Sequence, residues 1–171
     1  MGVDARGNRR LVKHLSADDW IVDEHRTKDG AAVLPGTGYL DLAAQALRAQ
    51  GETGAFEIND LYFFRAVSVP EQGSRELRAT LVRNAEGYEF SVRSDVIQGG
   101  AKGFVLNAQA QLGMLQEPAP TRLDLAAIAA RCGAVREGQG MASPQEAHLN
   151  FGLRWRVLNR VASGSGEGLA Q

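Results

Sequence analysis

The segment from His25 to Leu47 places the strongest constraint on what this chain can fold into. A lone histidine and a glycine-containing turn lead into a short apolar run, Ala31 to Leu34, and Pro35 and Gly36 then open an alanine-rich stretch. Proline is favoured at the start of a helix because its φ is already set. The segment therefore predicts a general base beside the positive end of a buried helix, an arrangement suited to removing a proton next to a carbonyl.

The pattern of apolar residues predicts one long helix in the first two thirds of the chain. It spans about 36–50 and ends at Gly51. Helical spacing places four apolar side chains on one face, and these are expected to be buried: Leu40, Ala43, Ala44 and Leu47.

Strand patterns surround this helix. Residues 11–25 predict a short strand or two, with Trp20, Ile21 and Val22 in the core. Four further strands are expected at about 56–69, 76–83, 88–94 and 104–112, and in the last of these Phe104, Leu106 and Ala108 are expected to share a face. Turns are expected at 84–87 and 99–100. By itself this pattern predicts an α+β domain.

The segment 25–47 resembles the first half of a polyketide synthase dehydratase domain. That family carries a histidine, a nearby glycine, a proline five residues after the glycine and a Gly-Thr-Gly-Tyr-Leu-type helix start. The matching residues are His25, Gly30, Pro35, Gly36, Thr37, Tyr39 and Leu40. Four residues separate the histidine from the glycine, where the family usually has three. The resemblance implies a hotdog fold, in which an antiparallel sheet wraps around a central helix.

The resemblance also divides the chain into parts. Residues 1–114 are interpreted as an N-terminal hotdog, residues 115–147 as a linker with a short helix at about 123–132, and residues 148–171 as the start of a second hotdog. A strand is expected from Phe151 to Val161, with side chains less buried than the first core. On this interpretation the chain is the first half of a double hotdog.

The match is weaker in the C-terminal part. Phe151, Gly152 and Trp155 fit an aromatic-Gly-Pro-x-aromatic signature of the second hotdog, with Leu153 in place of the proline. The family's second half also supplies an aspartate in an Asp-x-x-x-Gln or Asp-x-x-x-His motif, and no credible counterpart is found in this sequence. The catalytic acid is therefore expected outside residues 1–171, and this chain alone is expected to be incomplete as an enzyme.

The resemblance implies a role for each matching residue. His25 would act as the general base. A backbone amide near Gly30, together with the N–H groups that begin the helix at Gly36, would hold the thioester oxygen. Pro35 would make the helix start rigid, and Tyr39 would line the acyl tunnel or pack in the core. Ordinary turn chemistry also accounts for Gly30 and Pro35.

The implied activity is a 3-hydroxyacyl-[acyl carrier protein] dehydratase. It removes water from a 3-hydroxyacyl thioester to give the 2,3-enoyl thioester, without a metal or redox cofactor, and the phosphopantetheine arm belongs to the carrier. The implied partners are acyl carrier protein, other polyketide synthase domains and the second hotdog half, and a homodimer is an open alternative. Three other functions stay open: a pyran-forming cyclase or double-bond isomerase of the same fold, a non-catalytic acyl-thioester-binding module, and a hotdog thioesterase using Asp41.

Composition excludes several other classes of protein. The formal net charge is −1, so no nucleic-acid-binding footprint is visible. The single cysteine, Cys132, rules out an internal disulfide and a cysteine zinc site. No apolar run is long enough to span a membrane. A cytoplasmic location is expected.

Overall fold

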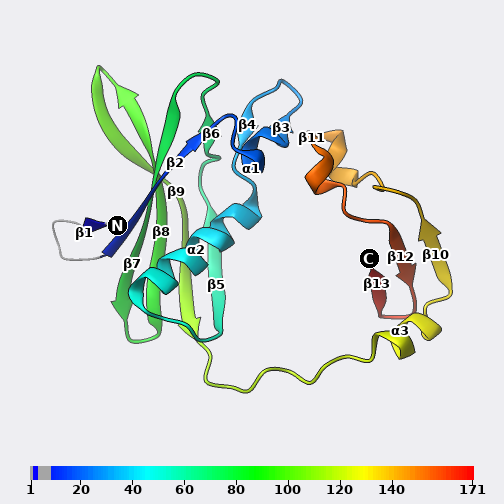
Figure 1. The fold of residues 1–171 in the computed structure, drawn as a ribbon. Helices are drawn as coiled ribbons and strands as arrows, with labels where there is room; N and C mark the ends of the chain where they lie inside the picture. The colour runs from blue at the N-terminus through cyan, green and yellow to red at the C-terminus, as the bar shows by residue number, and fades with distance from the viewer. Residues whose placement is uncertain (1, 4–8) are drawn as a thin grey trace. The chain divides into compact units, whose positions relative to one another are not determined.

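The chain forms two compact units. The computed structural model describes residues 2–3 and 9–171. Contacts divide it into Met1–Gln116 and Glu117–Gln171 (Figure 1). Each unit has a sheet of its own, and the segment 25–47 lies in the larger one.

The larger unit is a six-stranded antiparallel sheet with helix α2 (Gly36–Gln50) across one face (Figure 1). The strand order is β1-β2-β7-β8-β9-β5. The strands are β1 (Gly2–Val3), β2 (Arg9–Ser16), β7 (Ser74–Asn84), β8 (Gly87–Gln98), β9 (Ala101–Met114) and β5 (Phe56–Phe63). The sheet and α2 bury a common apolar core. This is the hotdog arrangement that the family resemblance implies.

Helix α2 begins after Pro35 and ends at Gly51, as predicted, but its buried face differs from the predicted one. Pro35 is the N-cap residue, and Gly51 ends the helix in the left-handed region with φ of 96°. Leu40 is 40% exposed and Ala44 is half-buried, so the predicted burial of these two residues is wrong. The buried face consists of Gly38, Tyr39, Leu42, Ala43, Ala46 and Leu47. The larger side chains Tyr39 and Leu42 face the sheet, because this buries more apolar area than turning Leu40 inward.

A β-bulge in β9 changes which side chains face the core. Val92 pairs with Ala108 and Arg93 pairs with Leu106, which leaves Asn107 as the extra residue. Phe104 lies under the guanidinium of Arg78, on the face of the sheet away from α2. The prediction that Phe104 and Ala108 share a face is therefore wrong, because the bulge reverses the alternation between them.

The long strand predicted at 56–69 is two strands. β5 ends at Phe63, and β6 (Ser68–Val69) pairs with β4 (Ala32–Val33). Asp60 has φ of 51° at a shift in register between β5 and β9.

The segment before His25 differs from its prediction. Residues Trp20–Asp23 form a helical turn, α1, rather than a strand. Val22 is fully buried, whereas Trp20 is 49% exposed. The turn leads directly into β3 (His25–Thr27), which pairs with β4.

The smaller unit has more regular structure than the sequence predicts. Its three-stranded sheet, in the order β10-β12-β13, consists of β10 (Ala134–Glu137), β12 (Arg160–Ser163) and β13 (Gly168–Ala170). The remaining elements are α3 (Leu125–Arg131), η1 (Pro144–Ala147), β11 (Leu149–Phe151) and η2 (Leu153–Trp155). The strand predicted from Phe151 to Val161 is interrupted by η2. As expected, its side chains are poorly buried: Trp155 is half-buried, and Val157 and Leu158 are exposed.

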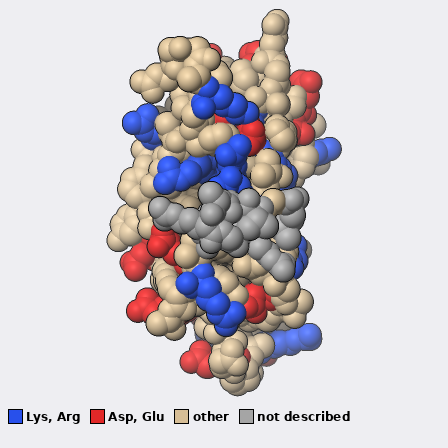
Figure 2. All heavy atoms as spheres, turned by 90° about the vertical axis from the view of Figure 1, so that its left-hand side faces the viewer, with Lys and Arg blue, Asp and Glu red and all other residues tan. Residues whose placement is uncertain are grey.

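The surface carries charges of both signs. Figure 2 shows Lys and Arg side chains interspersed with Asp and Glu on one face of the molecule. Opposite charges also pair on the outer side of the main sheet, where Glu76 contacts Arg78 and Lys102 at 2.7 and 2.6 Å. The mixture agrees with the formal net charge of −1.

Candidate active site

The imidazole of His25 is held by a backbone carbonyl eight residues away. Its Nδ1 lies 3.0 Å from the carbonyl oxygen of Val33. A carbonyl oxygen only accepts hydrogen bonds, so Nδ1 carries the proton, and a neutral ring then has its lone pair on Nε2. In this tautomer the basic nitrogen of the half-buried His25 ring is Nε2.

The turn between β3 and β4 accommodates the extra residue with its own hydrogen bonds. The N–H of Gly30 donates to the Thr27 carbonyl, and the N–H of Thr27 donates to the Ala31 carbonyl, both at 3.0 Å. Gly30 has φ of 92°, which side chains disfavour. Arg26 donates to the Gly30 carbonyl at 2.8 Å. The Gly30 N–H is thus engaged within the turn, and the turn-forming role of this glycine is visible in the structure.

The start of α2 explains the Gly-Thr-Gly part of the motif. Gly36 and Thr37 lie exposed in the first turn, where helical N–H groups have no partner within the helix. Gly38 is buried, and a Cβ there would lie only 2.6 Å from Cδ1 of Leu34. A glycine at this position lets Leu34 pack against the helix start. The Gly38 N–H donates to the Pro35 carbonyl at 2.9 Å. The N–H groups of Gly36 and Thr37 are of the kind that can hold a carbonyl oxygen on which negative charge develops.

A cavity of about 250 Å³ lies at this helix start. Its lining residues are Leu34, Gly36, Tyr39, Phe63, Arg65 and Ala66. The rings of Tyr39 and Phe63 meet edge to face, with centroids 5.1 Å apart. Burial raises the pKa of Tyr39 to about 12, and a hydrogen bond with the Val67 backbone acts in the opposite direction. Tyr39 is therefore a neutral wall residue at physiological pH.

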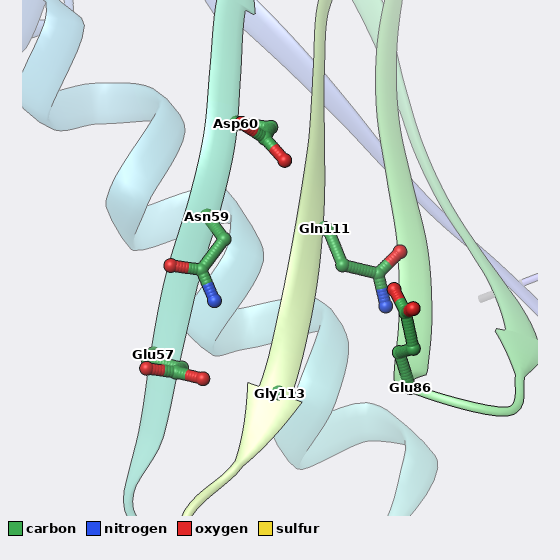
Figure 3. A pocket seen from close by; sticks show the side chains of 6 residues that line it. All are labelled: Glu57, Asn59, Asp60, Glu86, Gln111 and Gly113. Carbon is green, nitrogen blue, oxygen red and sulfur yellow. The ribbon is translucent and has the colours of Figure 1, made fainter.

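A larger hollow of about 440 Å³ lies elsewhere, on the other face of the sheet. Figure 3 shows its polar side chains on β5, β9 and the β7–β8 turn, with α2 behind the strands. They are Glu57, Asn59, Asp60, Glu86 and Gln111, with Gly113 completing the wall. The sheet separates this hollow from the helix start, so it is not part of the site at His25.

Two carboxylates of the larger unit, Asp41 and Asp95, accept hydrogen bonds from residues other than His25. Asp41, the possible thioesterase carboxylate, is exposed and accepts a hydrogen bond from Gln45. This pair has the Asp-x-x-x-Gln spacing, but within the first hotdog's own helix. Asp95 accepts a hydrogen bond from the Glu76 N–H at 2.9 Å. His14, on β2 of the same unit, is exposed.

The described residues show neither a metal site nor a membrane-spanning helix. In residues 2–3 and 9–171, no group of three or more His, Cys, Asp or Glu side chains could hold a metal ion. No helix in that part of the chain has the length and apolarity needed to cross a membrane.

The antiparallel sheet packed on α2 defines a hotdog domain. Comparison with known proteins shows to which family this hotdog domain belongs. The sequence profile described as "Polyketide synthase dehydratase domain" matches residues 3–95, more than half of the chain. The chain belongs to the polyketide synthase dehydratase domain family.

Individual relatives agree with this assignment. Polyketide synthase ThaG from Burkholderia thailandensis is 34% identical over 91 residues, which are 50% of this chain and 2% of ThaG. The dehydratase domain from the CurF module of curacin polyketide synthase has a TM-score of 0.80 at 18% identity, covering 99% of this chain. A trans-AT polyketide synthase dehydratase domain from Brevibacillus brevis has a TM-score of 0.78 at 18% identity. The chain spans 62% of the CurF domain and 64% of the Brevibacillus domain.

Proposed function

We propose that this chain forms the base-bearing half of a dehydratase that acts on a 3-hydroxyacyl thioester. His25 Nε2 removes the proton from the carbon next to the thioester carbonyl. The electron pair left by that C–H bond forms the 2,3 double bond as the C–O bond to the hydroxyl breaks. A proton from an acid outside residues 1–171 joins the hydroxyl, which leaves as water.

The observation that carries this proposal is the hydrogen bond between His25 Nδ1 and the Val33 carbonyl. It selects the tautomer that is basic at Nε2 and keeps the ring oriented. Val33 immediately precedes Leu34, which lines the cavity at the helix start. The carbonyl that orients His25 thus lies one residue before a segment that lines the cavity and leads into α2, whose first N–H groups would hold the thioester oxygen.

Family membership supports the choice of substrate and partners. We propose that the acyl chain arrives on the phosphopantetheine arm of an acyl carrier protein within a polyketide synthase in the cytoplasm. The second hotdog half would supply the acid, and proton transfer of this kind needs neither a metal nor a redox cofactor.

The test is replacement of His25 by alanine in the full dehydratase domain. Loss of a general base lowers the rate by about 10² to 10⁴-fold. His14→Ala is the matched control, since this exposed histidine lies in the same unit, on β2. The enoyl product on the carrier protein is followed by mass spectrometry, and circular dichroism checks folding. If folded His25→Ala retained more than about a tenth of the activity, His25 would not be the base.

A further inference from the structure

A second cavity, of about 210 Å³, adjoins the cavity at the helix start. The two share Arg65 and Ala66 in their walls. The second is more polar, because Arg75, Ser94, Asp95 and Asn107 also line it. Its wall residue Ser68 pairs with Val33, whose carbonyl holds His25. This polar cavity therefore lies one strand away from the residue that orients the base.

Asn107, in the wall of this cavity, has a side-chain acceptor without a hydrogen-bond partner in the described residues. It is 1% exposed. Its Nδ2 donates to the Arg65 carbonyl at 3.3 Å, while its backbone carbonyl accepts from the N–H groups of Phe64 and Arg65. Oδ1, by contrast, is buried without a hydrogen-bond partner in the described part of the chain. Rotating the side-chain amide of Asn107 by half a turn does not give Oδ1 a partner, because Oδ1 would then face the Arg65 carbonyl oxygen.

The other polar groups around the cavity are not placed to satisfy Oδ1. Arg75 donates to the backbone carbonyls of Ser68 and Asp95 at 2.9 and 2.8 Å. The Asp95 carboxylate accepts from the Glu76 N–H and lies 3.6 Å from Arg75. An unpaired buried acceptor costs free energy, so a donor from a bound molecule would be stabilising. The exposed guanidinium of Arg65 at the rim adds a donor for an oxygen of the same molecule.

We propose that this cavity is a polar subsite for an amide or hydroxyl group of the acyl thioester, with Asn107 Oδ1 accepting its N–H or O–H. The proposal rests on the proposed function, because it takes the ligand to be the thioester that His25 acts on. Two parts of such a substrate carry this chemistry: the amides of the pantetheine arm, and a hydroxyl further along the acyl chain.

The experiment compares three 3-hydroxyacyl thioesters on the full dehydratase domain. The 3-hydroxyhexanoyl ester of ethanethiol has no additional donor, the same acyl group on pantetheine adds amides, and 3,5-dihydroxyhexanoyl ethanethiol ester adds a hydroxyl. The wild type should show a higher kcat/KM for one donor-bearing substrate, which identifies the source. Asn107→Leu should reduce that preference roughly three- to tenfold and leave the plain ester nearly unaffected.

Asn107→Asp separates binding from a purely structural role. Both variants lose the hydrogen bond from Nδ2 to the Arg65 carbonyl, but only aspartate keeps an acceptor oxygen. The subsite predicts that Asn107→Asp retains the preference that Asn107→Leu loses, and equal behaviour of the two would overturn it. Asn59→Leu, on the exposed face of β5, is the control for the change of side chain.

This design tests the proposed function and the proposed subsite independently of each other. Turnover of the plain ester by the wild type tests dehydration alone. Binding of pantetheine and of 5-hydroxyhexanoyl ethanethiol ester, measured by NMR titration of the wild type and Asn107→Leu, needs no turnover. Equal dissociation constants of the two proteins for both probes, or equal kcat/KM of the wild type for all three substrates, would overturn the subsite.

Discussion

Glu76 combines burial with several cationic neighbours. The residue is 9% exposed, and its carboxylate lies 2.6 Å from Lys102 Nζ and 2.7 Å from Arg78 Nε. His14 Nε2 lies further away, at 4.0 Å. The hydrogen bonds from Lys102 and Arg78 lower the pKa of Glu76 below its ordinary value of 4.5, and burial opposes them. The ionised carboxylate therefore stabilises the folded state.

This lowered pKa predicts a pH-dependent effect of Glu76→Gln. A carboxylate whose pKa is lower in the folded state contributes stability above its unfolded pKa and loses it as the pH falls through the folded pKa. Glu76→Gln should lower the free energy of unfolding by on the order of 1 kcal/mol at pH 7, since Lys102 is partly exposed and water screens its charge. Urea unfolding at pH 7 and pH 3 measures the difference, which should shrink at pH 3.

Glu86→Gln is the control for this change, because Glu86 is exposed in the β7–β8 turn. It should leave the free energy of unfolding nearly unchanged at both pH values. A loss for Glu76→Gln that is equally large at pH 3 and pH 7 would contradict the stabilising role of the ionised carboxylate.

At the scale of elements, the contact between α2 and the sheet sets how closely the two can approach. Ala43 is fully buried on the sheet side of α2, and its neighbour Ala44 is only half-buried. A small side chain at position 43 allows the helix to lie near β2 and β7, with which α2 makes contact. Extra volume at this point has no space to occupy without moving the helix.

Ala43→Leu and Ala44→Leu should therefore differ in stability. Ala43→Leu should lower the free energy of unfolding by about 1–3 kcal/mol, the usual cost of overpacking a core. Ala44→Leu makes the same chemical change one residue further along the helix and should lower the free energy of unfolding by clearly less. Thermal or urea unfolding of the two variants measures the difference. Equal losses would show that α2 does not present Ala43 to the core.

At the scale of the whole molecule, the proposed function has the chain supply one of the two groups that dehydration requires. His25 is hydrogen-bonded to the Val33 carbonyl, whereas the carboxylate with Asp-x-x-x-Gln spacing, Asp41, is exposed on α2 and bonded to Gln45. The chain spans 62% of the CurF dehydratase domain. Family resemblance places the acid in the second half of such a domain.

We therefore expect residues 1–171 alone to dehydrate a carrier-bound 3-hydroxyacyl substrate far more slowly than a longer protein that includes the second hotdog. Absence of the acid should reduce the rate by about 10² to 10⁴-fold. The two proteins are assayed side by side with the same carrier-bound substrate. Comparable rates would show that the acid lies within residues 1–171, and the half-enzyme interpretation would be wrong.

Local chemistry in the sequence determined where the main elements lie. Pro35 and Gly51 delimit α2 through backbone preferences that act within a few residues. The turn at 84–87 is likewise local: β7 and β8 pair from Asn84 and Gly87 onward, as predicted. The histidine motif could also be recognised in the sequence, because its residues lie within one short segment. These features need no knowledge of what packs against them.

Tertiary structure decided which faces are buried and how the site is completed. Whether Tyr39 or Leu40 faces the sheet depends on the total apolar area that the sheet can cover, which the helical spacing alone does not specify. No sequence signal marks the bulge that turns Asn107 into the cavity wall, because it arises from the register between β8 and β9. The contact of His25 with Val33 depends on the pairing of β3 with β4, so only the folded chain selects the tautomer of His25.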